Sequence, residues 1–261
     1  GLLFLGCLLA FVRWEPAPYD LFLIIIFLLY ARGLTWKSYQ LVFVVLLGPL
    51  LFTHVPALGA ALEVAPERTL YYSLVTLYLA LSSVFFMSLP ERSVPLLLLG
   101  YEVGALLSGL LGVLAFLRIP GLEDLLWGGS RAVAFFKDPN VFGAFLIPAL
   151  FLALARLEQG RKFWILPALI LFLGVLVSLS RGAWANFAVA LLAWWLLRPR
   201  KRIWLPLVLL TLAGGVGISV VVMPDNPIVQ RLGFMPYDKE RFFTQMEALS
   251  LALTQPLGYG P

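Results

Sequence analysis

Arg181 stands between two long apolar runs, within Ser178-Leu179-Ser180-Arg181-Gly182. An arginine between apolar segments is costly unless it pairs with a polar group or faces water. Its guanidinium stays charged and offers five donors in a fork that fits phosphate oxygens. The motif predicts either a clamp for a phosphate-bearing substrate or an interfacial arginine that anchors the turn. The residues alone favour neither interpretation.

A second polar group, Lys137-Asp138-Pro139-Asn140, opens the apolar run at 139–155. Pro139 suits a first helical position, where its missing N–H is not needed, and Asp138 or Asn140 can cap the helix. A helix N-terminus also attracts anions. A well-formed helix start explains these residues, and contact with an anionic substrate is the alternative.

The charged cluster Asp238-Lys239-Glu240-Arg241 lies near the end of the sequence. Such a cluster is usually a solvated helix face. Arg241 is of interest as a second cation if it lies on the same side of the membrane as Arg181. This would place two guanidinium groups near one anionic substrate.

The remaining polar candidates are isolated. Glu102 lies inside the apolar run at 94–117, where we expect a structural hydrogen bond or a neutral buried acid. His54 is the only histidine and is expected near the end of a span, as an interfacial residue. Cys7 is the only cysteine, which excludes an intrachain disulfide. The sequence offers no Cys/His cluster, so no metal site is predicted.

The composition indicates that a membrane positions these residues. Hydrophobic residues make up 61% of the 261 residues and charged residues only 13%, about half the share in a soluble domain. The apolar runs approach the ~20 residues that cross ~30 Å of hydrocarbon as a helix, and backbone groups in lipid must bond internally. The predicted fold class is therefore all-α, a polytopic transmembrane helix bundle.

About nine apolar runs can be counted by hydrophobicity. They lie at 1–12, 20–31, 39–55, 69–88, 94–117, 139–155, 163–180, 182–197 and 203–223. The seventh and eighth are separated only by Arg181 and its neighbours, which predicts a tight helical hairpin. The net charge of +5 comes largely from loops between runs, so it signals topology rather than nucleic-acid binding.

Three short loops carry the basic residues that set the orientation. They contain Arg32 and Lys37; Arg156, Arg161 and Lys162; and Arg198, Arg200, Lys201 and Arg202. Nine spans place all three loops on one side, which the positive-inside rule makes cytoplasmic. The N-terminus is then cytoplasmic, and Arg181 and the motif at 137–140 lie on the outer face.

The C-terminal segment, residues 224–261, differs in composition from the rest of the sequence. Residues 1–223 form the predicted transmembrane bundle, and residues 224–261 begin a loop on the outer face. Its apolar residues share one helical face, at Phe242, Met246, Leu249 and Leu253. They predict an amphipathic helix over 238–253, capped by Asp238, at the membrane surface or against the bundle.

Together, these motifs resemble the bacterial O-antigen ligase and polymerase family. The resemblance lies in Phe136–Asn140 at a helix start and Ser180–Gly182 at a hairpin about 40 residues later. In the C-terminal segment, Arg241 is followed by Glu247-Ala248-Leu249 and by Pro256-Leu257-Gly258-Tyr259-Gly260. The matching region runs from about residue 131 to 261, and the first half is similar only in its apolar helices.

The resemblance implies a metal-independent glycosyltransferase, without a cofactor, in the bacterial inner membrane. Its donor would be a glycan on undecaprenyl pyrophosphate at the periplasmic face. Ligases pass the glycan to lipid A-core, the favoured activity, and polymerases pass it to another carrier-linked repeat. The family's pyrophosphate-binding arginines map onto Arg181 and Arg241. The motifs add substrate contacts at Lys137, Asp138, Asn140 and Ser180.

One family feature has no counterpart in this sequence. A histidine later in the large loop is the family's proposed base, and His54 is in the wrong place to replace it. We therefore expect a longer protein with about a dozen spans. Two other classes stay open: a transporter or flippase for a lipid or small anion, with Glu102 as its candidate, and an assembly protein without chemistry.

Overall fold

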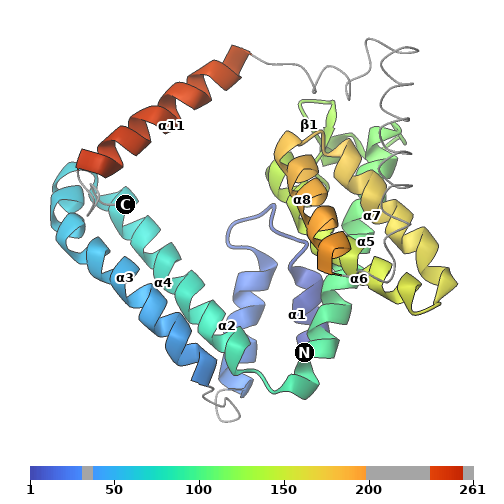
Figure 1. The fold of residues 1–261 in the computed structure, drawn as a ribbon, viewed down its shortest axis with the longest axis horizontal. Coiled ribbons are helices and arrows are strands. Elements are labelled where there is room, and N and C mark those ends of the chain that lie inside the picture. The colour runs from blue at the N-terminus through green and yellow to red at the C-terminus, as the bar shows by residue number, and fades with distance from the viewer. Residues whose placement is uncertain (31–37, 198–235, 255–261) are drawn as a thin grey trace. The chain divides into compact units, whose positions relative to one another are not determined.

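The computed structural model describes residues 1–30, 38–197 and 236–254. These residues are mostly helical, which confirms the predicted class at that level (Figure 1). The helices are α1 (Leu2–Leu8), α2 (Pro18–Tyr30), α3 (Ser38–Val64), α4 (Pro66–Ser88), α5 (Val94–Phe116), α6 (Pro139–Glu158), α7 (Ile165–Val177), α8 (Arg181–Leu197) and α11 (Pro236–Thr254). Short 3₁₀ turns are η2 (Glu91–Ser93), η3 (Glu123–Leu125) and η4 (Lys162–Trp164). The strands β1 (Leu126–Trp127) and β2 (Arg131–Ala132) form an antiparallel ribbon.

The chain divides into two compact units. The first comprises Gly1–Ile26 and Pro95–Phe234, and the second comprises Phe27–Val94 and Met235–Pro261. Helices α5 to α8 therefore fall almost entirely in the first unit, whereas α3, α4 and α11 belong to the second. The predicted boundary after residue 223 lies outside the described residues.

Three described helices are long and apolar enough to cross a membrane. They are Pro66–Ser88, Glu91–Phe116 and Pro139–Glu158. Pro18–Tyr30 and Lys162–Val177 are shorter apolar helices. Within the described part of the chain, the structure thus supports a helical protein with three candidate spans, and the run predicted at 203–223 lies outside it.

The first predicted run, 1–12, does not form one helix. Helix α1 ends at Leu8, and the backbone N–H of Val12 instead donates to the carbonyl of Phe135, at 3.1 Å. Helix α1 lies close against α5: a Cβ at Gly104 would stand 2.6 Å from the carbonyl oxygen of Cys7. The absence of a side chain at Gly104 thus permits close packing of the two helices, and the chain then turns away to pair with the loop before α6.

The long loop that the predicted runs at 39–55 and 69–88 leave between them is not present. Helix α3 continues to Val64, and α4 begins at Pro66, so Ala65 alone joins them. The segment 57–63 is rich in alanine and leucine, which are strong helix formers, and Pro66 suits the first turn of the next helix. His54 consequently lies inside α3 and not near its end.

The core of the first unit forms around α6. Phe142, Leu146 and Leu150 recur every four residues and are buried on one face of this helix. Glycines let the neighbouring helices approach that face: a Cβ at Gly112 would stand 2.7 Å from Phe142, and one at Gly174 would stand 2.6 Å from Leu146. This packing holds α6 against α5 and α7, and thereby fixes where α6 begins.

The second unit contains a helical hairpin and α11. Helices α3 and α4 lie side by side (Figure 1), joined by hydrogen bonds from Gln40 to the carbonyl of Val84 and to Ser88 Oγ. Helix α11 covers the segment that the sequence predicts as helical. Asp238 lies in its first turn rather than at its cap, because the helix begins two residues earlier.

Candidate functional site

The first part of the site is the start of α6. Asp138 is its N-cap, and its carboxylate accepts a hydrogen bond from the backbone N–H of Asn140, at 2.6 Å. Pro139 occupies the first helical position. Both features match the helix start predicted from the sequence. The cap holds the first turn of α6 in place and leaves the Asn140 side chain exposed.

The second part is the turn of the α7–α8 hairpin, which the sequence predicts correctly. Ser178 and Ser180 are both buried. The hydroxyl of Ser178 donates to the carbonyl of Val175, at 2.7 Å, whereas Ser180 Oγ accepts from the N–H of Ala183, at 3.2 Å, and so caps α8. Leu179 adopts a left-handed conformation, with φ of 48°, which costs a non-glycine residue about 1–2 kcal/mol.

These two parts contact each other directly. The hydroxyl of Ser180 donates to Asn140 Oδ1, at 2.8 Å, across a separation of 40 residues. Gly143 makes the approach possible, because a Cβ there would stand 2.6 Å from Ser178 Oγ and 2.8 Å from the Cβ of Ala183. The beginnings of α6 and α8 therefore lie together. Each helix N-terminus carries a partial positive charge.

Arg131 is the member of the site that the sequence analysis missed. From β2, its Nε donates to the carbonyl of Ser178, at 3.1 Å, and its Nη2 donates to Asn140 Oδ1, at 3.2 Å. It thus connects both motifs at once. The residues around Arg131 do not mark it as a better site candidate than the nearby Arg118. The only feature of the sequence that could have identified it is its position nine residues before Asn140.

Arg181 is the first residue of α8 and is half-buried. It directly follows Ser180, so its place beside the contact between the two motifs is set by the turn. Gly182 is exposed, and the nearest atom to a Cβ built there is Ser180 Oγ, at 3.9 Å.

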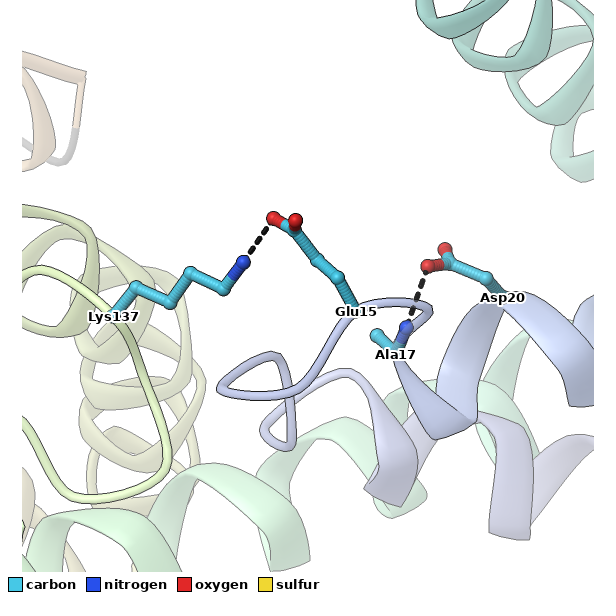
Figure 2. A network of polar contacts seen from close by, with 4 residues as sticks. All are labelled: Glu15, Ala17, Asp20 and Lys137. Atoms are coloured by element: carbon cyan, nitrogen blue, oxygen red, sulfur yellow. Dashed lines mark hydrogen bonds and ion pairs between the residues drawn. The ribbon is translucent and has the colours of Figure 1, made fainter.

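Lys137 has an acidic partner within the protein. Its ammonium forms an ion pair with the carboxylate of Glu15, and both side chains are substantially exposed. Figure 2 shows the two side chains reaching toward each other, with Asp20 nearby accepting a hydrogen bond from the N–H of Ala17. Lys137 must exchange this partner, or share it, in order to contact an anionic substrate.

The loop before Arg131 also carries a carboxylate with a perturbed pKa. The backbone N–H groups of Glu123 itself and of Gly121 lower the pKa of the Glu123 side chain by hydrogen bonding to its charged form. Glu123 therefore stays ionised at neutral pH. It is fully exposed and forms no part of the cluster around Asn140.

Two further predicted candidates are Arg241 and Glu102. Arg241 is an exposed residue of α11 and belongs to the second unit. Glu102 is buried in α5 and forms an ion pair with Arg156 of α6, at 2.6 Å. The guanidinium of Arg156 also lies 4.1 Å from the ring centroid of Trp164. This pair joins two helices, as expected for a structural role.

The chemistry that the cluster can perform is anion binding. Arg131 and Arg181 are permanent cations, and two helix N-termini add partial positive charge. Within the described residues, no group of three or more His, Cys, Asp or Glu side chains could hold a metal ion. No protein-family model, curated protein or solved structure matches the chain.

Proposed function

We propose that the protein is a membrane glycosyltransferase that moves a glycan from undecaprenyl pyrophosphate to an acceptor at the periplasmic face of the inner membrane. The favoured activity is that of an O-antigen ligase, with lipid A-core as acceptor. A polymerase of O-antigen or another surface polysaccharide would use the same donor chemistry. The observation that carries the proposal is the hydrogen bond between Asn140 and Ser180, which joins the two motifs of the family resemblance.

Arg181 has the central role in the proposed reaction. The acceptor hydroxyl attacks the anomeric carbon of the donor, and the bond from that carbon to the pyrophosphate oxygen breaks. Negative charge grows on the leaving group, and the guanidinium of Arg181 stabilises it by hydrogen bonds and charge. Arg241 is the proposed second cation for this pyrophosphate, and the acceptor hydroxyl gives its proton to a general base other than these two arginines.

The other motif residues hold the substrate in this proposal. Asn140 donates to phosphate oxygens, and Lys137 leaves Glu15 for the ligand. Asp138 and Ser180 act by capping α6 and α8. The site faces the periplasm in a bundle of about nine spans within this sequence, with the N-terminus in the cytoplasm. The three described apolar helices of membrane-crossing length support the placement of the protein in a membrane.

A transporter of lipids or small anions is the alternative from another class. The observation in its favour is the buried pair Glu102–Arg156, since charged residues within spanning helices often mark transport pathways. The ring of Trp164 against Arg156 argues for a structural pair instead. A transporter would move its substrate across the membrane without breaking the bond to pyrophosphate.

The test is a transfer assay with the full-length protein in nanodiscs. It supplies an undecaprenyl pyrophosphate-linked glycan and lipid A-core, and follows the products by mass spectrometry. We expect transfer by the wild type and a loss of about 10²–10³ in rate for Arg181→Ala. The matched control is Arg161→Ala, an exposed arginine at the start of η4, which should leave the rate unchanged. A folded Arg181→Ala protein with the wild-type rate would refute the proposed role.

A further inference from the structure

The amide group of Asn140 has a defined orientation. Its Oδ1 atom accepts two hydrogen bonds, from Arg131 Nη2 at 3.2 Å and from Ser180 Oγ at 2.8 Å. A guanidinium can only donate, and the hydroxyl of Ser180 already accepts from the N–H of Ala183, so its proton is available for Asn140. Arg131 therefore requires the oxygen of the amide, and not its nitrogen, on this side, and the Ser180 hydroxyl donates to the same oxygen.

The opposite edge of the same amide carries two N–H donors at Nδ2. The described residues give Nδ2 no acceptor, and Asn140 is exposed. Rotating the amide to exchange its oxygen and nitrogen would set its N–H groups against those of Arg131 and break that bond, so Arg131 decides the orientation. The Nδ2 donors thus face away from Arg131 and Ser180, at the end of α6 that adjoins Arg181.

We propose that Arg131 is a positioning residue for the pyrophosphate of the lipid-linked donor, acting through Asn140. Arg131 holds the amide so that Nδ2 donates to a phosphate oxygen, and the bond from its Nε to the Ser178 carbonyl fixes the guanidinium in place for this task. This inference rests on the proposed function, because it assigns a residue to that same site. Arg131 lies outside both motifs of the family resemblance, so those motifs do not predict this role.

The geometry explains why an arginine is needed at position 131. One planar guanidinium reaches two acceptors on separate elements, the backbone of Ser178 and the side chain of Asn140. A lysine ammonium is a single point on a flexible stem, and its donors have no fixed fork. The strand pairing of Trp127 with Arg131, and the burial of Ala132, anchor the backbone from which the guanidinium extends.

A double-mutant cycle tests whether Arg131 acts through Asn140. The measurement is the Kd of the protein in nanodiscs for undecaprenyl pyrophosphate, with wild type, Arg131→Lys, Asn140→Ala and the double variant. We expect each single variant to weaken binding about 10-fold, the value of a hydrogen bond to a charged group. The double variant should bind no more weakly than Asn140→Ala alone. Multiplied effects would mean that Arg131 contacts the anion directly, and would overturn the inference.

Asn140→Asp separates positioning from folding. A carboxylate can still accept from Arg131 and Ser180, so the melting temperature should be kept or raised, but it replaces the Nδ2 donors with a negative charge. We expect pyrophosphate binding to fall by at least 10-fold in this variant. The control is Ser130→Asp, which adds the same charge at an exposed position beside Arg131 and should leave binding within about twofold. Equal binding by Asn140→Asp and wild type would refute the inference.

The failure of this inference can be told apart from a failure of the proposed function. If wild-type protein does not bind undecaprenyl pyrophosphate, both proposals fall. If wild type binds it and loses binding in Arg181→Ala, while Arg131→Lys binds as tightly as wild type, then only the role of Arg131 falls. The melting temperature of each variant, measured beside its Kd, shows that it is folded.

Discussion

Gly143 permits the close contact between α6 and the hairpin turn that assembles the site. Replacing it by alanine tests this contact directly. An added Cβ would stand 2.6 Å from Ser178 Oγ and 2.8 Å from the Cβ of Ala183, whereas carbon atoms normally touch at about 3.5–4.0 Å. The start of α6 and the hairpin turn would have to separate by roughly 1 Å to restore normal contact. Asn140 lies one turn before Gly143, so its hydrogen bond with Ser180 would stretch.

The magnitude follows from two opposing effects. Overpacking of this kind costs about 1–3 kcal/mol, and the greater helix propensity of alanine offsets up to about 1 kcal/mol of it. A net loss of about 1–2 kcal/mol corresponds to a melting temperature lower by roughly 2–8 °C for a protein of this size. The assay is thermal unfolding in detergent, combined with the Kd for undecaprenyl pyrophosphate.

Gly109 provides the matched control within the same core. It too is a buried helical glycine, but a Cβ there would lie 3.7 Å from its nearest neighbours, Ile170 and Leu171, at ordinary contact distance. We therefore expect Gly109→Ala to unfold at the wild-type temperature or above it, and to bind the ligand normally. If Gly143→Ala were as stable as Gly109→Ala and bound as tightly, the close approach of α6 to the hairpin would be refuted.

Three further predictions concern charges and caps. Arg156→Ala leaves the buried carboxyl group of Glu102 without its partner and should lower the free energy of unfolding by about 3–5 kcal/mol. Glu102→Gln introduced into that variant should recover part of this stability, and no recovery would refute the structural role of the pair. Asp138→Ala removes the cap of α6 and should lower stability by about 1 kcal/mol, measured by thermal unfolding, whereas a wild-type melting curve would argue against the cap. Glu15→Gln breaks an exposed ion pair with Lys137 and should change stability by less than about 1 kcal/mol; a larger drop in melting temperature would show that the pair is structural.

Much of the local structure follows from the sequence because it depends on neighbouring residues. The apolar runs identify α4, α5 and α6, since membrane-crossing helices need long apolar segments. Asp138 followed by Pro139 marks the start of α6 through two independent preferences for a helix N-terminus. The polar turn around Arg181 marks the hairpin. In each case the residues that decide the structure lie within a few positions of one another.

Element boundaries were harder to predict where tertiary contacts compete with hydrophobicity. Residues 9–12 are largely apolar, yet α1 ends at Leu8 and Val12 pairs with Phe135, more than a hundred positions away. Helices α3 and α4 are joined by a single residue, Ala65. The polar residues nearby indicate a loop, but the strong helix formers before Ala65 extend α3 through that segment.

The composition alone determined that this is a helical protein suited to a membrane, because only lipid can cover so much apolar surface. The motif residues and the helices that begin at them were equally visible in the sequence. Only the tertiary structure brought Asn140 to Ser180 and placed Arg131 between the two motifs. The physical reason is close packing: Gly143 lets α6 approach the hairpin, and neither a 40-residue separation nor an isolated arginine reveals such a contact before the helices are packed.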